Sequence, residues 1–284
     1  MRFGAHFSIA GGVDRAAERA REVKADCLQM FVKSPSQWRF ATLSEDEVRR
    51  FRTTAREAGL RPLVGHASYL VNLASPDPVL CERSRRCLLE EWDRSERLGL
   101  ECLVVHPGAH MGSGAAAGLA RIADALDWLH RERPGRRVRI ALETSAGGGT
   151  ELCGRFEDFR AVLALSDSPE RIAVAIDTCH LFAAGYELRK AAAIDDLLGQ
   201  LDAAADLRRL LVVHANDAKG DRGSHLDRHE HIGRGKLGRE AFRLLVNHPA
   251  LAALPFILET PKEDEKGRAM DPVNLRTLRQ MVAG

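Results

Sequence analysis

The sequence predicts an α/β fold, a single-domain TIM (β/α)8 barrel that spans residues 1–284. Eight short runs rich in apolar and β-branched residues alternate with segments of helical pattern, which is typical of repeated βαβ units. The runs are almost continuously apolar, as expected of parallel strands that are buried on both faces. Histidine and acidic residues recur where these runs end, and functional residues of such a barrel lie at the carboxyl ends of its strands.

The expected strands and helices alternate along the chain. Strands are expected over Arg2–Phe7, Asp26–Phe31, Arg61–His66, Cys102–His106, Val138–Glu143, Ile172–Asp177, Leu210–His214 and Phe256–Glu259. Helices are expected over Asp14–Val23, Glu45–Ala58, Pro78–Leu98, Ala116–Arg133, Phe156–Leu165, Ala192–Ala205, Arg239–Val246 and Pro272–Val282. A start signal supports the second helix, because Ser44 precedes Glu47 by three residues, as in a capping box.

An open, doubly wound sheet is the competing fold. It would normally carry a glycine-rich phosphate-binding turn after the first strand. The segment GAHFSIAGG, which begins at Gly4, does not match the GxGxxG pattern of that turn. We therefore interpret Gly11 and Gly12 as residues that shape a loop at the mouth of a barrel.

Composition indicates a globular protein with a large core, since 45% of the residues are hydrophobic and 29% are charged. The six cysteines form no CxxC pair and are expected to be reduced. The amino terminus does not resemble a leader, and no apolar stretch approaches roughly 18 residues, so we expect a cytoplasmic protein without a membrane contact. A net charge of +2 argues against binding of polyanions through bulk charge, although divalent ions in one cleft would attract phosphate.

Nine histidine and acidic residues form a candidate metal site at strand ends and in the loops that follow. They are His66, His106, Glu143, Asp177, His180, His214, Asp227, His229 and Glu259. Imidazole and carboxylate ligands without thiolates suit zinc, manganese or iron at a hydrolytic centre. One such residue alone is more often a hydrogen-bonded structural residue, but nine at one barrel end favour metal binding. The central Glu143 could bridge two ions about 3.5–4 Å apart and leave room for a hydroxide nucleophile.

Four further polar residues lie close to these candidates in the sequence, and a fifth, His6, lies at the end of the first expected strand. His6 could be a tenth ligand, but we expect it to orient a ligand or to pack in the core. Asn216 and Asp217 lie two and three residues after His214 and are expected to hold ligands in place, with Asp217 as a direct ligand the less favoured alternative. His225 and His231 are expected to contact solvent or a phosphate.

Eight segments, taken in order, resemble those of the endonuclease IV family, whose members act on apurinic/apyrimidinic sites in DNA. The segments are GAHFSIAGG, GHASYLVNLASP, VVHPGAH, ALETSAG, AIDTCH, VHANDAK, LDRHEHIG and ILETP. The resemblance implies a barrel that holds three zinc ions, with manganese or iron as possible substitutes. The implied ligands are His66, His106 and Glu143 for one ion, Glu143, Asp177, His214 and Glu259 for the second, and His180, Asp227 and His229 for the third.

The resemblance also implies hydrolysis of the phosphodiester bond 5′ to an abasic site in double-stranded DNA, leaving a 3′-hydroxyl and a 5′-deoxyribose phosphate. A hydroxide between two zinc ions would attack phosphorus in line, and the third ion would stabilise the departing 3′-oxygen. The implied catalytic residues are Glu143, which would bridge the ions, and Asp177 and Glu259, which would hold the nucleophile. A monomer with 3′-end trimming as a side activity is implied as well.

Tyr69 and Leu70 match positions that the family inserts into bent DNA. The gap forms at an abasic sugar, which costs less to extrude than a normal nucleotide because it neither stacks nor pairs. Ordinary packing within the loop is the alternative role for both side chains.

The loop KSPSQW departs from the family, because Ser36 stands where an arginine often precedes the Gln37–Trp38 pair. Either Lys33 or Arg39 would take over the DNA contact next to Gln37, or the gap would be filled less well. Candidate phosphate contacts on the loop after the seventh strand are Lys219, Arg222, Arg228, Arg234 and Lys236.

Two other functions compete with this one. A sugar isomerase or epimerase on a similar barrel needs fewer ligands and would leave His180, Asp227 and His229 without a shared purpose. A non-catalytic DNA-binding module would use its metals structurally, yet structural zinc sites close their coordination with protein ligands. Metal content separates the first alternative, and loss of cleavage with binding retained after substitution of Glu259 would exclude the second.

Overall fold

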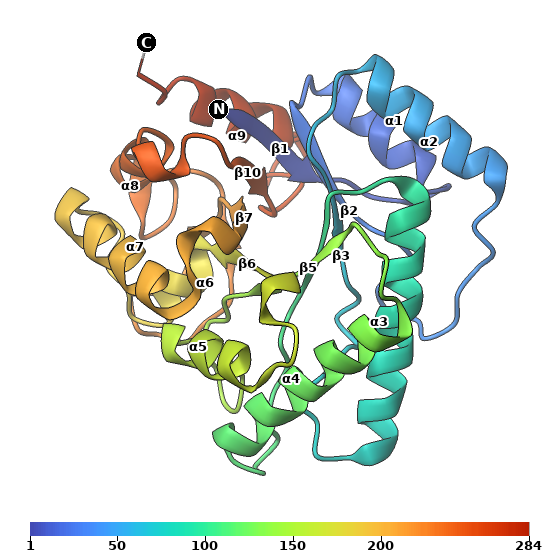
Figure 1. Ribbon diagram of the computed structural model, residues 1–284. Coiled ribbons are helices and arrows are strands. Elements are labelled where there is room, and N and C mark those ends of the chain that lie inside the picture. Colours follow the sequence, from blue (N-terminus) through green and yellow to red (C-terminus); the bar gives the residue numbers. More distant parts are fainter. Residues whose placement is uncertain (284) are drawn as a thin grey trace.

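Eight parallel strands close into a barrel in the computed structural model, which describes residues 1–283 (Figure 1). The order around the barrel is β1-β10-β7-β6-β5-β4-β3-β2, and β2 pairs with β1 to complete the ring. The barrel strands are β1 (Arg2–His6), β2 (Cys27–Phe31), β3 (Leu63–His66), β4 (Cys102–Val105), β5 (Arg139–Glu143), β6 (Ile172–Asp177), β7 (Leu210–His214) and β10 (Pro255–Leu258). The predicted fold class is confirmed.

Helices surround the strands on the outside of the barrel (Figure 1). They are α1 (Asp14–Glu22), α2 (Glu45–Glu57), α3 (Pro78–Leu98), α4 (Ala115–Glu132), α5 (Phe156–Leu165), α6 (Thr178–Ala183), α7 (Ala191–Ala205), α8 (Gly238–Val246) and α9 (Asp271–Arg279). The predicted capping box begins α2, since the Ser44 hydroxyl accepts from the Glu47 N–H and the Glu47 carboxylate accepts from the Ser44 N–H.

Three elements, one helix and two short strands, were not predicted from the sequence. Helix α6 follows β6 without a loop, and all six of its residues are buried, so it carries no apolar periodicity. Its start is fixed by Asp177, whose carboxylate accepts the His180 N–H at 2.9 Å. The strands β8 (Asp217–Ala218) and β9 (His229–Glu230) form an antiparallel pair that is too short to show alternation.

Asp217 organises the long loop between β7 and α8. Its carboxylate accepts hydrogen bonds from backbone N–H groups, which belong to Ala218, Gly233, Gly235, Leu237 and Gly238. The expectation that Asp217 holds a metal ligand is therefore wrong, because both of its oxygens bind the backbone of its own loop.

The inside of the barrel explains where the polar residues gather. A small apolar cluster fills it, made of Cys27, Val64, Cys102, Val104, Ala141, Ala173, Ala175, Val212 and Ile257. Successive side chains of a strand point to opposite faces, so the next inward position lies two residues further on. Those positions are Gln29, His66, His106, Glu143, Asp177, His214 and Glu259. A polar layer therefore covers the apolar core at the carboxyl ends of the strands.

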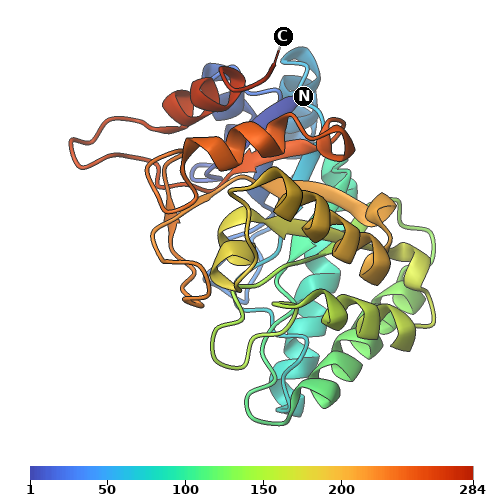
Figure 2. The same ribbon diagram turned by 90° about the vertical axis from the view of Figure 1, so that its left-hand side faces the viewer.

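The loops that follow β7 and β10, residues 215–237 and 259–270, project from one side of the molecule (orange and red in Figure 2). Because all barrel strands are parallel, these loops border the same end as the polar layer. No helix within residues 1–283 combines the length and apolar character needed to cross a membrane.

Candidate metal centre

The nine predicted ligands converge at the carboxyl end of the barrel. Their ligand atoms form three groups, and within each group the atoms lie within 4.8 Å of one another. The groups are His66, His106 and Glu143; Glu143, Asp177, His214 and Glu259; and His180, Asp227 and His229. These are the three sets that the family resemblance implies, and Glu143 belongs to two of them.

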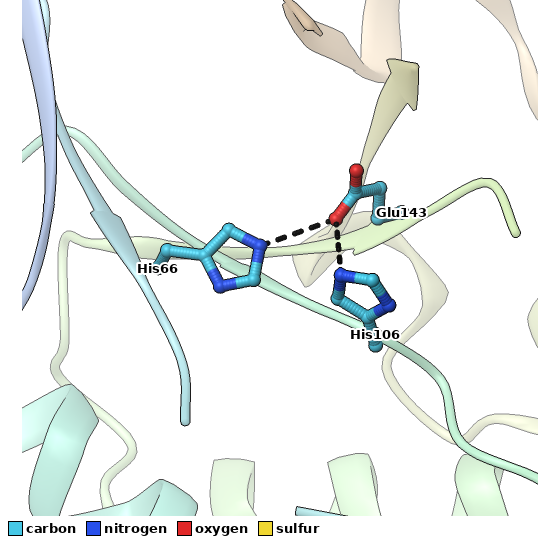
Figure 3. A group of neighbouring side chains, drawn as sticks. All are labelled: His66, His106 and Glu143. Atoms are coloured by element: carbon cyan, nitrogen blue, oxygen red, sulfur yellow. Dashed lines mark hydrogen bonds and ion pairs between the residues drawn. The ribbon is translucent and has the colours of Figure 1, made fainter. Parts of the chain in front are cut away.

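Glu143 is fully buried at the end of β5 and lies at the centre of the site. The Nε2 atoms of His66 and His106 point at the same carboxylate oxygen, Oε2, at 3.3 and 3.2 Å (Figure 3). The other oxygen, Oε1, lies 2.7 Å from Nδ1 of His214 and 3.6 Å from Nδ1 of His180. One carboxylate thus joins imidazoles from four parts of the chain.

Asp177 and Asp227 connect the remaining ligands. In the second group, Nδ1 of His214 lies 3.3 Å from Oε2 of Glu259 and 4.0 Å from Oδ2 of Asp177. In the third group, the Nε2 atoms of His180 and His229 lie 3.3 and 3.2 Å from Oδ1 of Asp227. Nε2 of His229 is also 3.6 Å from Oδ2 of Asp177, so the second and third groups adjoin.

Four of the imidazole rings are oriented by a hydrogen bond from one ring nitrogen. The acceptors are the Ala67 carbonyl for His66 Nδ1 (2.8 Å), the Thr144 carbonyl for His180 Nδ1 (2.7 Å), the Glu259 carbonyl for His229 Nδ1 (3.1 Å) and Gln29 Oε1 for His214 Nε2 (2.7 Å). The opposite nitrogen of each ring is left facing its group, where it can hold a proton or a metal ion. This arrangement is typical of metal-binding histidines.

Gln29 is a residue of this site that the sequence analysis did not single out. Its amide Nε2 donates to Oε1 of Glu259 at 2.6 Å, and its Oε1 accepts from His214, so it bridges two ligands of the second group. Its Nε2 also lies 3.1 Å from Nδ1 of His6, in line with the expectation that His6 orients a ligand. The available signal was a polar residue two positions after Cys27 inside the apolar run CLQMF.

Asn216 holds two further ligands, as expected from the sequence. Its amide Nδ2 donates to Oδ2 of Asp177 at 2.6 Å, and its Oδ1 accepts the N–H of Glu259 at 2.7 Å. These bonds fix the ends of β6 and β10 relative to each other.

The donor set fits divalent metal ions. Four carboxylates gather among imidazole nitrogens, an arrangement that needs positive charge to offset repulsion between the acids. The buried Nε2 of His229 has no hydrogen-bond partner within residues 1–283, although it faces Asp227. Cys179 also lies near Asp177 and His229, but burial raises the pKa of its thiol far above the usual range and disfavours the thiolate that a metal would bind.

Without metal ions, protonated histidines would offset the negative charge of the carboxylates. Burial opposes protonation of His214 and His229, but the neighbouring carboxylates outweigh it and raise the pKa of each ring to about 9. Burial also opposes ionisation of Glu143, but His214 and His106 outweigh it and hold the pKa of this carboxyl well below its usual range. The metal-free site therefore favours imidazolium ions next to carboxylates.

We expect the metal-free protein to lose stability as the pH rises from about 6.5 to about 9. The folded-state pKa of His214 and His229 exceeds the ordinary value of 6.5, so their contribution is complete below pH 6.5 and disappears as the rings deprotonate near pH 9. The Tm of chelator-treated protein should fall by at least about 5 °C over this range. Metal-loaded protein should not show this loss, because metals bind the deprotonated ligands. A constant or rising Tm of the metal-free protein would contradict these charge states.

The exposed residues predicted to contact DNA lie around the opening of the site. Tyr69 is 68% exposed, and its ring stands edge-on to Phe31 with the centroids 5.1 Å apart. Leu70 is half-buried, whereas Gln37 and Arg39 are exposed. The basic residues of the loop after β7 are also exposed; they are Lys219, Arg222, Arg228, Arg234 and Lys236.

The structure contradicts the prediction that Lys33 contacts DNA. Its side chain is only 2% exposed, because the chain after β2 turns it inward toward α3. There its Nζ donates to the carbonyls of Ser34 and Gln37 and lies 3.5 Å from Oε1 of Glu91. Lys33 and Arg39 were the two candidates to take over the DNA contact of the family's arginine, which is Ser36 here. Only Arg39 is exposed.

The two histidines expected to contact solvent or a phosphate differ from each other. His231 is 5% exposed and pairs with the amide of Asn274 at 3.2 Å, so the expectation is wrong for this residue. His225 is exposed, but its Nδ1 donates to the Ala146 carbonyl at 2.8 Å and thereby joins the loops after β7 and β5.

A cavity of about 210 Å³ opens onto the metal-site residues. Tyr69 and Lys262 line it together with ligands of all three groups. A wider hollow of about 780 Å³ lies between the loops after β7 and β10, and its lining includes Lys219, Glu230, Glu263 and Arg268. The ligands are therefore accessible to a substrate from the end of the barrel.

Known proteins share both this architecture and this sequence. A family model described as a xylose isomerase-like TIM barrel matches residues 17–280. A protein of Chloroflexus aurantiacus named "Probable endonuclease 4" is 45% identical over 283 residues, which cover 100% of this chain and 99% of the relative. The chain belongs to the endonuclease IV family. The resemblance stated from the sequence is confirmed.

A second endonuclease IV relative, the "Probable endonuclease 4" of Geobacter sulfurreducens, is 42% identical over 279 residues, with 98% of this chain and 94% of the relative covered. Endonuclease IV from Thermus thermophilus has a crystal structure that matches with a TM-score of 0.86 at 37% identity, over 99% of this chain and 98% of that one. A D-tagatose 3-epimerase-like protein matches with a TM-score of 0.75 but only 18% identity, over 99% of this chain and 96% of that one, so that likeness concerns the fold alone.

Proposed function

We propose that this protein hydrolyses the phosphodiester bond 5′ to an abasic site in double-stranded DNA, leaving a 3′-hydroxyl and a 5′-deoxyribose phosphate. The observation that carries the proposal is the meeting of three ligand groups, two of which share Glu143, below the exposed Tyr69. Membership of the endonuclease IV family supports a nucleic acid as the substrate. A one-metal sugar isomerase would have no use for the group of His180, Asp227 and His229.

We assign one zinc ion to each of the three ligand groups. His66 and His106 would hold the first together with Glu143, and His180, Asp227 and His229 would hold the third. The second would lie among Glu143, Asp177, His214 and Glu259. When bound, such ions supply Lewis acidity that neutralises phosphate charge and lowers the pKa of water. Manganese or iron suits the same nitrogen and oxygen donors.

The catalytic residues of this proposal are Glu143, Asp177 and Glu259. Glu143 sets the separation of the first two ligand groups, because its two oxygens face different histidines. Asn216 holds the carboxylate of Asp177 and the backbone N–H of Glu259, and Gln29 holds the carboxylate of Glu259, so both carboxylates keep a fixed geometry. Carboxylates fixed in this way can orient an attacking water and accept its proton.

In this proposal, side chains around the opening of the metal site bind the DNA substrate. Tyr69 and Leu70 would fill the gap that an extruded abasic sugar leaves in the base stack. Gln37 and Arg39 would contact the neighbouring strand. Phosphate contacts would come from the loop after β7, chiefly from Lys219 and Arg228. The monomeric state, the cytoplasmic location and the 3′-end trimming activity stay predictions.

Replacement of Tyr69 by alanine tests the recognition of the lesion. We expect KM to rise about tenfold for a duplex with one tetrahydrofuran abasic analogue, since stacking of a base on an aromatic ring contributes about 1–3 kcal/mol. The kcat should change by less than about threefold, because the ligand groups are untouched. Steady-state cleavage measures both constants.

A matched control is Leu165→Ala, which removes an apolar side chain that is 54% exposed at the end of α5, away from the mouth. It should leave both constants unchanged. A wild-type KM for Tyr69→Ala would show that Tyr69 does not enter the DNA.

A further inference from the structure

A buried ion pair lies beneath the loops that carry the proposed DNA contacts. Lys33 follows β2 and Glu91 lies in α3; the Nζ and Oε1 atoms are 3.5 Å apart, and the side chains are 2% and 0% exposed. A buried pair gains little over apolar residues of the same size, because both charges lose their hydration. General stability therefore does not explain why charges occupy this place.

The pair holds two loops, residues 33–40 and 67–70, which we call the mouth loops. Lys33 donates to the carbonyls of Ser34 and Gln37 and so closes the first mouth loop around its ammonium group. Both carboxylate oxygens of Glu91 accept the N–H of Ser68, each at 3.2 Å, directly before Tyr69. Each partner thus fixes the backbone of one mouth loop.

The two mouth loops also bind each other at the same point. The hydroxyl of Ser68 donates to the carbonyl of Pro35 at 2.7 Å and accepts the N–H of Leu70 at 3.2 Å. Helix α3 also holds the two ends of the first mouth loop, because Arg94 donates to the carbonyls of the flanking residues Val32 and Ala41 at 2.7 and 2.8 Å. The mouth loops therefore rest on α3 as a unit.

We propose that Glu91 and Lys33 are positioning residues that fix the mouth loops relative to each other and thereby set the affinity for abasic DNA. This inference rests on the proposed function, in which Tyr69, Gln37 and Arg39 contact the lesion. Loops ordered before binding lose less conformational entropy when DNA binds. Since neither charge belongs to a ligand group, the pair should affect KM and not the chemical step.

Glu91→Gln is the most direct test, because glutamine keeps the volume and an acceptor for Ser68 but leaves Lys33 without a counter-charge. We expect KM for the tetrahydrofuran duplex to rise about tenfold, with kcat within about twofold of wild type and the metal content unchanged. Amide hydrogen exchange should quicken in the mouth loops, residues 33–40 and 67–70, and stay unchanged in the barrel strands.

The matched control is Asp93→Asn, two residues further along α3. Asp93 pairs with Arg133, with Nη2 and Oδ2 2.8 Å apart, and with Arg136 near the amino end of β5, away from the mouth. Its loss should lower stability without a change in KM or in exchange of the mouth loops. Equal effects of Glu91→Gln and Asp93→Asn on KM would reduce the pair to a structural role and overturn the inference.

A double variant keeps the inference testable if Glu91→Gln does not fold. Lys33→Met combined with Glu91→Leu removes both charges together, so no buried charge is left unpaired and folding should be retained. In this variant the Ser68 N–H loses its acceptor and the carbonyls of Ser34 and Gln37 lose their donor, so KM should again rise about tenfold. A wild-type KM in this folded variant would overturn the inference. If the wild-type protein leaves abasic DNA uncut, the proposed function is wrong, and hydrogen exchange alone decides whether the pair orders the mouth loops.

Discussion

Replacement of Glu143 by glutamine should lower kcat for abasic DNA by at least about 10³-fold and remove metal from the first two ligand groups. The reason is its central place, with Oε2 facing His66 and His106 and Oε1 facing His214. A neutral amide cannot offer two anionic oxygens to the two groups. Metal analysis and steady-state cleavage of the same preparation measure both effects.

The control is Glu151→Gln, which removes an exposed carboxylate from the loop after the same strand, β5. It should keep the wild-type metal content and kcat. Full metal content in a folded Glu143→Gln variant would contradict the shared-ligand role of Glu143, even if activity were lost.

Glu259→Gln should abolish cleavage while DNA binding is retained. Glu259 lies 3.3 Å from His214 and accepts a hydrogen bond from Gln29, but it stands below the exposed residues that we expect to contact DNA. We expect kcat to fall by at least about 10³-fold, whereas the Kd for a tetrahydrofuran duplex stays within about threefold. Single-turnover cleavage and a binding titration separate the two effects.

The exposed Glu263 on the loop after β10 provides the matched control, and Glu263→Gln should cut DNA at the wild-type rate. Retained cleavage in Glu259→Gln would remove Glu259 from the catalytic residues. Joint loss of binding and cleavage in a folded variant would show that this carboxylate serves the DNA complex as a whole.

The eight barrel strands and all nine candidate ligands could be predicted because the signal is local. A run such as IAVAID shows where a buried strand ends, and parallel strands bring their ends together. The grouping of the ligands came from the family resemblance, since sequence spacing does not say that His66 and His106 face one oxygen of Glu143.

Residues whose role depends on side-chain direction could not be predicted in this way. Gln29 faces inward only because of its register with Cys27, and Lys33 turns toward α3 because Glu91 lies there, 58 residues further along the chain. Helix α6 was missed because a fully buried segment of six residues has no polar face to set a period. Tertiary contacts decide each of these features.

The most direct test of the proposed function is cleavage of a duplex with one tetrahydrofuran abasic analogue, next to an undamaged duplex, by protein of measured metal content. The analogue cannot undergo β-elimination, so only hydrolysis produces a cut. Incision 5′ to the analogue by protein with about three zinc ions per chain, without incision of the undamaged duplex, is the predicted result. No incision by fully metal-loaded protein, or saturation with a single ion, would contradict it.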